Sequence, residues 1–428
     1  MAMMETHRNQ QLISDKIYPR DSGNVGVYNP SGQYRLRLFI NGCWRMVEID
    51  DLLPCFPLPV TLESDWNTRV IMSASSTIKG ELWVPLLEKG YLRALGNGYD
   101  SKSINPFDVF FSFCQWIPQT SWNLKGIFEK DYEWKKLVRR VKSDNILVIL
   151  GIQQIDMNDQ GPQRFNFITT HSYTLIDVAQ IGNSKLFRLR DAHRKEQVSR
   201  KFNSTTLLQQ YEKRNDGSFW IDIEDAKKYF SMGFLSWRPD LFTYKQQINF
   251  VWKEQQYMHD TIDELSQFAP QFLLYKRSKE QKIWILLHRH YQSKVSPYSL
   301  IESEQKEEDM LISISFCRHN HPEERPVNPK ITHRDGNICF SSTYSKSHFN
   351  LFQIGLFDED IHKTDQNELG LNEVQLHLAK MQEFTCNYVG WFTIRAEILK
   401  APEHSKGDLR FSLYIFSDQK VDQPVPIY

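Results

Sequence analysis

The chain has 428 residues, of which 40% are hydrophobic and 13% aromatic, so it can bury sizeable cores in two or three domains. Lysine and arginine together number 52, and aspartate and glutamate also number 52. This balance excludes a net charge that would attract nucleic acid or an anionic membrane over the whole surface.

The first predicted elements are a hairpin and a helix. Residues 33–49 alternate apolar and polar side chains around Asn41-Gly42, a pair that accepts the positive φ angles of a two-residue turn. Residues 81–95 place apolar side chains three and four positions apart, which predicts a helix with one apolar face. Gly96 is typical of the residue that ends such a helix.

Residues 106–190 are predicted to turn mainly to strands. The apolar runs are 145–152, 171–179 and 185–190. The basic run 135–142 spaces its apolar residues as a helix with a solvated charged face. Residues 216–231 predict a turn, a strand and a short helix.

From about residue 262 the pattern changes to short strands in series. Polar or acidic loops separate the segments FLLYK, KIWILLHRH, DMLISISF, HFNLFQIGL, WFTIRAEI and LRFSLYIF. Such a series without a long helix predicts an antiparallel β-sandwich.

Cysteine usage and apolar run lengths bear on location. The cysteines are Cys43, Cys55, Cys114, Cys317, Cys339 and Cys386. Their wide spacing without a Cys-x-x-Cys pair predicts reduced thiols rather than a disulfide framework. The first residues hold no apolar core of signal-peptide length, and the longest apolar run, 146–152, is far shorter than a membrane span. We therefore expect a soluble, cytoplasmic protein.

A histidine and an aspartate stand at the two ends of one predicted hairpin. His171 begins the first strand and Asp191 ends the second, and antiparallel pairing around a turn near Gly182 brings these ends within a residue or two. A carboxylate beside an imidazole can fix its tautomer and orientation, as general-base catalysis requires. The same pattern is typical of an ordinary surface pair, so the hairpin alone leaves both interpretations open.

Metal sites find little support. The candidates for a zinc site are Cys317, His319, His321 and His333. Their spacing matches no standard zinc motif, and His288 and His290 on one strand face are predicted to be structural. An EF-hand beginning at Asp358 would need glycine where the chain has Lys363. We predict no metal and no cofactor; a looser acidic calcium loop stays an alternative.

Several segments, in their order and spacing, resemble one protease family. An Asn-Pro-x-Gly turn and a Val-x-Ile-Asp-Asp-x-Leu-Pro ending occur in VYNPSGQYRLRLFINGCWRMVEIDDLLP, and a glutamate-x-tryptophan helix in ELWVPLLEKGYLRALGNGYD. A His-x-Tyr strand occurs in THSYTLIDV, and a further signature of the family resembles DGSFWIDIEDAKKYF. Strands of the family's sandwich resemble APQFLLY, IWILLHRH and LRFSLYIFS. Over nearly its whole length the chain resembles the calpain family, in particular the PalB type without EF-hands.

The resemblance implies an α+β fold, namely an incomplete papain-like two-lobed calpain protease core followed by an antiparallel calpain-type β-sandwich. The implied parts are 1–105 (remainder of the helical, cysteine-bearing half), 106–247 (sheet half with the histidine), 248–261 (linker), 262–420 (sandwich) and 421–428 (tail). His171 would then be the general base. Asp191 would stand at the family's orienting asparagine.

Two departures from the family pattern bear on activity. The family's nucleophilic cysteine lies upstream of the Asn-Pro-x-Gly turn, where this chain has no Cys-Ser-x-Val segment. Cys43 in a hairpin turn and Cys55 after the Asp-Asp-x-Leu-Pro segment are not at a helix N-terminus that would favour a thiolate. The family's asparagine and tryptophan are replaced by Asp191 and His193. We therefore expect this chain to lack the nucleophile and, by itself, protease activity.

Three functions are consistent with these features. The first is a calpain-like cysteine endopeptidase whose N-terminal part is missing from this chain. The second is a pseudoprotease scaffold, and the third is an adaptor that binds proteins or endosomal membrane through its sandwich. The resemblance implies protein substrates or partners, limited proteolysis in ambient-pH signalling, and recruitment to endosomal sorting complexes. The balanced charge predicts no nucleic-acid partner, and the short apolar runs predict no transmembrane segment.

Overall fold

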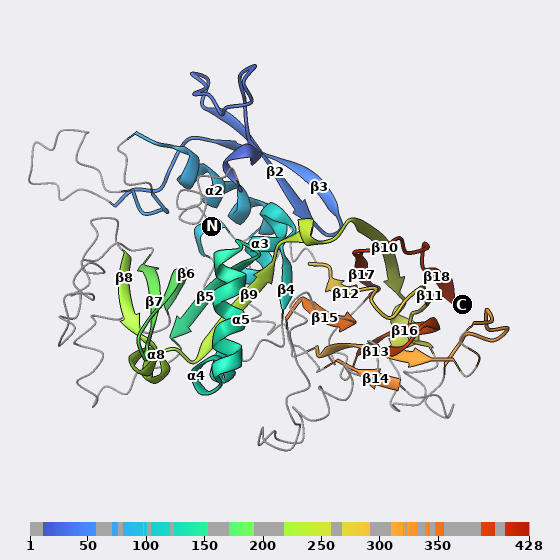
Figure 1. Cartoon of the computed structure of the whole chain (residues 1–428). Coiled ribbons are helices and arrows are strands. Elements are labelled where there is room, and N and C mark those ends of the chain that lie inside the picture. The colour runs from blue at the N-terminus through green and yellow to red at the C-terminus, as the bar shows by residue number, and fades with distance from the viewer. Residues whose placement is uncertain are drawn as a thin grey trace, which may run out of the picture. The chain divides into compact units, whose positions relative to one another are not determined.

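The computed structural model describes residues 12–56, 71–75, 80–96, 98–100, 104–119, 124–152, 171–191, 218–257, 268–291, 310–319, 321, 323–331, 339–342, 347–354, 387–398 and 407–427. The chain divides into two compact units, Met1–Gln115 with Tyr291–Ser303, and Trp116–His290 with Glu304–Tyr428. Helices and several antiparallel sheets make up the described residues, which confirms the predicted α+β class (Figure 1).

The first unit contains a three-stranded antiparallel sheet in the order β1-β2-β3. Its strands are β1 (Ile17–Tyr18), β2 (Gln33–Ile40) and β3 (Cys43–Asp50). The predicted hairpin is confirmed, because every β2 residue has a β3 partner in one unbroken register. Asn41 and Gly42 form its turn with φ angles of 52° and 76°, the positive values that a tight hairpin turn of this hand requires.

Helix α2 (Trp83–Leu95) confirms the helix predicted over 81–95, and Gly96 ends it with a φ of 81°. Leu86, Leu87 and Tyr91 of the helix share one core with alternate residues of strand β2, namely Tyr34, Leu36, Leu38 and Ile40. A Cβ at Gly90 would lie 2.6 Å from Leu36 Cδ2, so glycine at this position permits the close approach of helix and sheet.

Helix α3 (Pro106–Cys114) lies where we predicted strands to begin, so that prediction is wrong. The Asn105 side chain caps the helix by accepting a hydrogen bond from the Phe107 backbone N–H at 2.9 Å, and Pro106 stands in the first turn. Most of its phenylalanines are buried, so the run lacks the apolar-polar period that identifies a surface helix. Helix α3 belongs to the first unit, which extends to Gln115 rather than to residue 105. Single-turn helices of this unit are η1 (Ser14–Lys16) and η3 (Gly98–Asp100).

The second unit contains a six-stranded antiparallel sheet in the order β4-β9-β5-β6-β7-β8. Its strands are β4 (Ile117–Gln119), β5 (Ile146–Ile152), β6 (His171–Ile181), β7 (Ser184–Asp191), β8 (Ser218–Asp222) and β9 (Met232–Trp237). Its helices are α4 (Leu124–Glu129), α5 (Asp131–Lys142) and α8 (Ile223–Tyr229). Helix α5 confirms the helix predicted over 135–142, and its Trp134 packs on Phe187 of β7 with ring centroids 5.8 Å apart.

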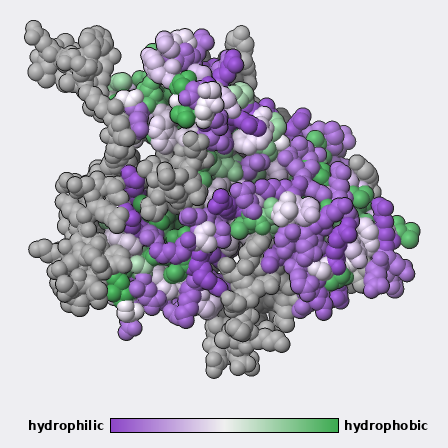
Figure 2. All heavy atoms as spheres, turned by 45° about the horizontal axis from the view of Figure 1, so that its top comes forward, coloured by the Kyte–Doolittle hydropathy of each residue, from purple (hydrophilic) through white to green (hydrophobic). Residues whose placement is uncertain are grey.

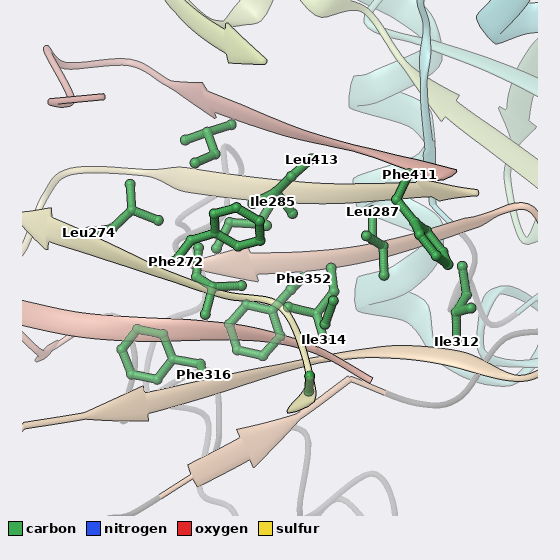
Figure 3. Packing of buried hydrophobic residues seen from close by; sticks show 14 of the residues in the cluster. Phe272, Leu274, Ile285, Leu287, Ile312, Ile314, Phe316, Phe352, Phe411 and Leu413 are labelled. Carbon is green, nitrogen blue, oxygen red and sulfur yellow. The ribbon is translucent and has the colours of Figure 1, made fainter. Parts of the chain in front are cut away.

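Two further antiparallel sheets of the second unit face each other across one hydrophobic core. One has the order β10-β17-β12-β15 and the other β14-β13-β16-β11-β18. The strands are β10 (Tyr244–Trp252), β11 (Gln271–Lys276), β12 (Ile283–Arg289), β13 (Ile312–Arg318), β14 (Cys339–Ser341), β15 (Phe349–Ile354), β16 (Gly390–Ile398), β17 (Leu409–Ser417) and β18 (Val425–Ile427). Figure 3 shows core side chains of both sheets meeting between them, among them Phe272, Ile285, Ile314 and Phe352. The predicted series of strands therefore forms a β-sandwich.

Both ends of this sandwich differ from the sequence prediction. Strand β10 pairs with β17 along its whole length, so residues 248–252, which we placed in a linker, are sandwich. Helix α9 (Glu254–Tyr257) and η4 (Pro239–Leu241) flank that strand. Strand β18 pairs with β11, so the predicted tail 421–428 also contributes a strand. Strand β10 shows no strong apolar run, because it lies at a sheet edge, where polar side chains are tolerated. Strand β18 is also an edge strand and is only three residues long, too short to give a clear sequence signal.

An aromatic cluster joins the six-stranded sheet to the sandwich within the second unit. Trp284 of β12 is fully buried and contacts the ring of Trp237, at the end of β9, with centroids 5.2 Å apart. Phe242 contacts Trp284 at 4.9 Å and Phe416 of β17 at 5.6 Å. These rings are shared by both parts, so the two parts have a continuous interior.

Hydrophilic residues cover most of the coloured surface in Figure 2, and hydrophobic residues occur there in small groups. Among the residues that the structure describes, no helix is long and apolar enough to cross a membrane.

Candidate active site

The hairpin of β6 and β7 brings the predicted pair together. His171 begins β6 and Asp191 ends β7, and the two strands pair around a turn in which Gly182 has a φ of 57°. His171 Nε2 lies 2.9 Å from Asp191 Oδ1, within hydrogen-bond distance. The aspartate side chain is fully buried and the histidine side chain is 15% exposed. A buried carboxylate of this kind is unlike the surface pair that was the alternative interpretation.

A β-bulge in β6 decides that these two side chains share a face. From the turn, pairing runs regularly to Asp177↔Arg188, and it then continues with Leu175↔Leu189, so Ile176 has no partner in the ladder. The shift places Asp191 opposite Tyr173, on the face that also carries His171. With the same residues and no bulge, Asp191 would lie opposite Thr174 and point to the other face.

The hydrogen bond assigns a role to each ring nitrogen of His171. With Asp191 ionised, its carboxylate can only accept, so Nε2–H of His171 is then the donor in this hydrogen bond. In the neutral ring, Nδ1 is then the basic nitrogen. Because Asp191 lies in a water-poor environment, the hydrogen bond that holds the ring is stronger than it would be at the surface.

Aromatic rings form the floor of the site. Tyr173 is fully buried, and its ring meets the His171 ring edge to face, with centroids 5.0 Å apart and planes at 82°. The rings of Phe219 of β8 and Phe230 after α8 contact the Tyr173 ring, with centroids 6.1 Å and 5.6 Å away. The imidazole therefore has a polar contact with Asp191 and an aromatic contact with Tyr173.

The thiols whose side chains are described lie in poor positions for a nucleophile. Cys43 begins β3, and Cys55 lies outside any helix and forms an isolated bridge with Ile71. Cys114 ends α3, where the helix dipole disfavours a thiolate, and its Sγ donates to the Leu12 carbonyl at 2.9 Å. Cys317 is disulfide-bonded, so the prediction of reduced thiols is wrong for that residue.

The backbone explains why sequence spacing gave no sign of this disulfide. Cys317 of β13 pairs in register with Cys339 of β14, although 22 residues separate them in the chain. Cross-strand neighbours of this kind follow from sheet register, which sequence spacing does not reveal. The side chains of Cys339, Cys386 and His193 lie outside the described residues.

The proposed zinc ligands do not assemble in the described part of the chain. His319 is mostly buried, and its Nε2 lies 2.9 Å from Thr393 Oγ1, while His333 lies outside the described residues. No group of three or more histidine, cysteine, aspartate or glutamate side chains that could hold a metal ion occurs among the described residues. The acidic segment 357–368 also lies outside them, so the calcium alternative stays a prediction.

His288 of β12 and His290, which follows the strand, have structural contacts. His288 is buried and stacks on Phe349 with centroids 4.5 Å apart, and burial lowers its pKa well below the ordinary value. His290 Nε2 lies 2.6 Å from Ser412 Oγ on the neighbouring strand β17. Both contacts link neighbouring strands of one sheet of the sandwich, in agreement with the structural role predicted from the sequence.

Sequence reasoning missed the bulge and the aromatic floor. Ile176 carries no local signal, because a bulge depends on pairing with another strand. Tyr173 could have been found, since alternate residues of a strand share a face and Tyr173 stands two positions after His171.

Comparison with known proteins defines the class of protein to which this hairpin belongs. Residues 1–233, more than half of the chain, match the family described as "Calpain family cysteine protease". The chain therefore belongs to the calpain family of cysteine proteases, and the resemblance seen in the sequence is confirmed.

The relatives narrow this assignment. The chain is 26% identical over 308 residues to the calpain-like protease palB/cpr-8 of Neurospora crassa, covering 71% of this chain and 31% of that protein. It is 28% identical over 313 residues to human calpain-7, covering 68% and 36%. The corresponding match to palB of Emericella nidulans is 26% identical over 314 residues, covering 71% and 34%. The chain thus spans about a third of the length of these relatives.

A solved structure of the clostridial cysteine protease Cwp84 matches with a TM-score of 0.20 and 8% identity, over 74% of this chain and 60% of that one. We draw no conclusion about the fold from a match at that level.

Proposed function

We propose that this chain is the histidine-bearing part of a calpain-type cysteine endopeptidase. In this proposal His171 is the general base, and Asp191 orients it and stabilises the imidazolium. The observation that supports it is the 2.9 Å hydrogen bond to a fully buried carboxylate, at the two strand ends of a hairpin inside the matched family region. A buried carboxylate that orients an imidazole is the arrangement that general-base catalysis needs.

The proposed reaction is hydrolysis of a peptide bond in a protein substrate. Nδ1 of His171 takes the proton of a cysteine thiol, and the thiolate adds to the peptide carbonyl carbon. The imidazolium then gives this proton to the leaving amine as the C–N bond breaks, which leaves an acyl-enzyme for water to hydrolyse. Throughout, the Nε2–H of His171 donates to Asp191, so the negative carboxylate offsets the positive ring.

The thiol itself is a separate part of the proposal. Among the thiols described, none stands at a helix N-terminus, which is where backbone N–H groups and the helix dipole favour a thiolate. We therefore propose that this chain alone does not cleave peptides, although it supplies the base. The fold in this proposal is an incomplete two-lobed papain-like core followed by a calpain-type sandwich.

The setting is proposed by similarity to the palB proteins and calpain-7. It comprises a cytoplasmic location with recruitment to endosomal sorting complexes, and limited proteolysis of a protein in ambient-pH signalling. The sandwich with its continuous core supports a role in partner binding, since it is a rigid platform on the same compact unit as His171.

A thiol-directed probe tests the catalytic proposal. The purified chain is incubated with an epoxysuccinyl probe beside its His171→Ala variant, and labelled cysteines are mapped by mass spectrometry. We expect equal, slow background labelling of both proteins. Labelling of one cysteine that depends on His171 would show that this chain holds its own nucleophile. The transcript provides a second measurement, because an in-frame Cys-Ser-x-Val helix upstream of Met1 would supply the missing thiol.

A pseudoprotease scaffold is the second candidate function, and the poorly placed thiols favour it. It predicts that purified endosomal sorting proteins or anionic vesicles bind the full chain with equal affinity before and after His171→Ala. Loss of such binding in the variant, or no binding at all, would count against the scaffold and leave the protease proposal in place.

A further inference from the structure

Tyr173 contacts both members of the His171–Asp191 pair. Tyr173 lies two positions after His171 on the same face of β6, and it is the direct cross-strand partner of Asp191. It is therefore the one described residue that neighbours His171 along the strand and Asp191 across the ladder.

The geometry of the hairpin makes such a neighbour necessary. Since Asp191 is opposite Tyr173, His171 reaches the aspartate along a diagonal of the ladder, where backbone positions are about 7–8 Å apart. The His171 side chain must therefore lean toward Asp191 to bring Nε2 within the observed 2.9 Å of Oδ1. The Tyr173 ring limits the other orientations of the imidazole, because its centroid lies 5.0 Å from the imidazole centroid with the two planes at 82°.

Tyr173 is itself held rigidly. Its exposed fraction is 0%, and Phe219 and Phe230 meet its ring nearly at right angles, at 89° and 80°. These partners come from β8 and from the residue after α8, two elements outside the hairpin. Through Tyr173, the packing of Phe219 and Phe230 thus limits the orientations open to the imidazole.

We propose that Tyr173 is a positioning residue that fixes the His171 ring on the diagonal to Asp191 and keeps water from their hydrogen bond. Edge-to-face aromatic pairs have a defined preferred geometry, so the contact selects one ring orientation rather than merely filling space. An apolar floor also preserves the strength of the hydrogen bond above it. This inference rests on the proposed role of His171 only for its importance to catalysis; the contact itself can be measured without activity.

The test uses the full chain labelled with 15N-histidine, and it reads the Nε2–H resonance of His171 by NMR. The His171→Gln variant assigns the resonance. In Tyr173→Leu we expect a shifted resonance and about tenfold faster exchange of this proton with water, the size expected for weakening one hydrogen bond. Tyr173→Phe keeps the ring and should restore both values.

Leu175→Ala is the matched control for general loss of packing. Leu175 lies on the same strand and face, two positions beyond Tyr173, and is 2% exposed. We expect this variant to lose stability without a change in Nε2–H exchange. An unchanged resonance and exchange rate in Tyr173→Leu, or an equal change in Leu175→Ala, would overturn the proposal.

A second variant covers the case in which Tyr173→Leu does not fold. Phe219→Leu removes one of the two rings that support Tyr173, and we expect a smaller change of exchange in the same direction. No change there would equally contradict the proposal. The thiol-probe experiment reads the nucleophile and not this contact, so failure of the catalytic proposal and failure of the positioning role remain distinguishable.

Discussion

The hairpins β2–β3 and β6–β7 have similar turns and strand ends, but the pairing of β6–β7 shifts by one residue. Both have a two-residue turn of asparagine and glycine, in opposite order, and both end their second strand in an aspartate that accepts a hydrogen bond. In β2–β3 the ladder is unbroken and Asp50 accepts from Lys89. In β6–β7 the ladder is shifted and Asp191 pairs with His171.

The surroundings of the two aspartates differ most. The Asp50 side chain is 49% exposed, whereas that of Asp191 is fully buried. An exposed ion pair is screened and stabilises little, while a buried pair is strong and costly to break. The regular hairpin β2–β3 thus packs against helix α2. The bulged hairpin β6–β7 instead places His171 and Asp191 together on one face.

The largest difference between the two hairpins is expected in the stability lost when one residue is deleted from each. Deleting Arg37 from the regular ladder moves Leu36 and Tyr34 to the outer face, which should cost more than about 4 kcal/mol and prevent stable folding of that sheet. Deleting Ile176 removes the unpaired residue of the bulge and keeps Asp191 opposite Tyr173. The second deletion should cost only about 1–3 kcal/mol for the lost buried side chain.

Denaturant unfolding followed by fluorescence measures both deletions, and the His171 Nε2–H resonance reports whether the pair survives. Equal losses of stability would show that the bulge has no special tolerance. Loss of the resonance in the Ile176 deletion would show that the bulge itself shapes the site.

Replacing the buried aspartate should have the next largest effect. Asp191→Ala removes the fully buried acceptor of the partly buried His171 donor, so the free energy of unfolding should fall by about 2–3 kcal/mol. Asp191→Asn is the matched control, because its amide oxygen still accepts from Nε2–H, and it should stay within about 1 kcal/mol of the parent. A large loss in the asparagine variant would instead assign the stabilisation to the negative charge.

The exposed aspartate should give the smallest effect and a defined pH dependence. The hydrogen bond from Lys89 holds the pKa of Asp50 below its ordinary value. Its contribution is therefore present above about pH 4 and disappears as the pH falls through the lowered pKa. Asp50→Asn should cost less than about 1 kcal/mol at pH 7, since the pair is half exposed, and progressively less as the pH falls below about 4. A difference that does not shrink with falling pH, or that is insensitive to salt, would contradict this account.

The contrast between the hairpins also marks what the sequence could predict. Alternation and turn residues were enough for β2–β3, and spacing of apolar residues was enough for α2, because these signals are local. The closeness of His171 and Asp191 followed from antiparallel pairing alone. Their shared face did not, because it depends on the unpaired Ile176, and pairing choices of that kind are made between strands.

Other parts of the fold escaped prediction for similar reasons. Helix α3 is buried on nearly all sides, so its phenylalanines show no helical period, although Asn105 and Pro106 are typical start signals. Strand β10 finds its partner in β17, far along the chain, and its alternating exposed residues alone did not place it in the sandwich. Family resemblance was needed to give His171 a catalytic interpretation.

The pairing of β10 with β17 has a consequence for synthesis of the protein. Tyr244 leaves the ribosome early, but its partner Ser417 follows 173 residues later (417 − 244). At about 5–20 residues per second, β10 waits roughly 10–35 s for its place in the sheet. During that interval Trp284 also lacks one of its neighbours, since its cross-strand partner Phe416 lies on the same late strand. The sandwich, and with it the full support of Trp237 at the end of β9, is therefore completed only after β17 has been synthesised.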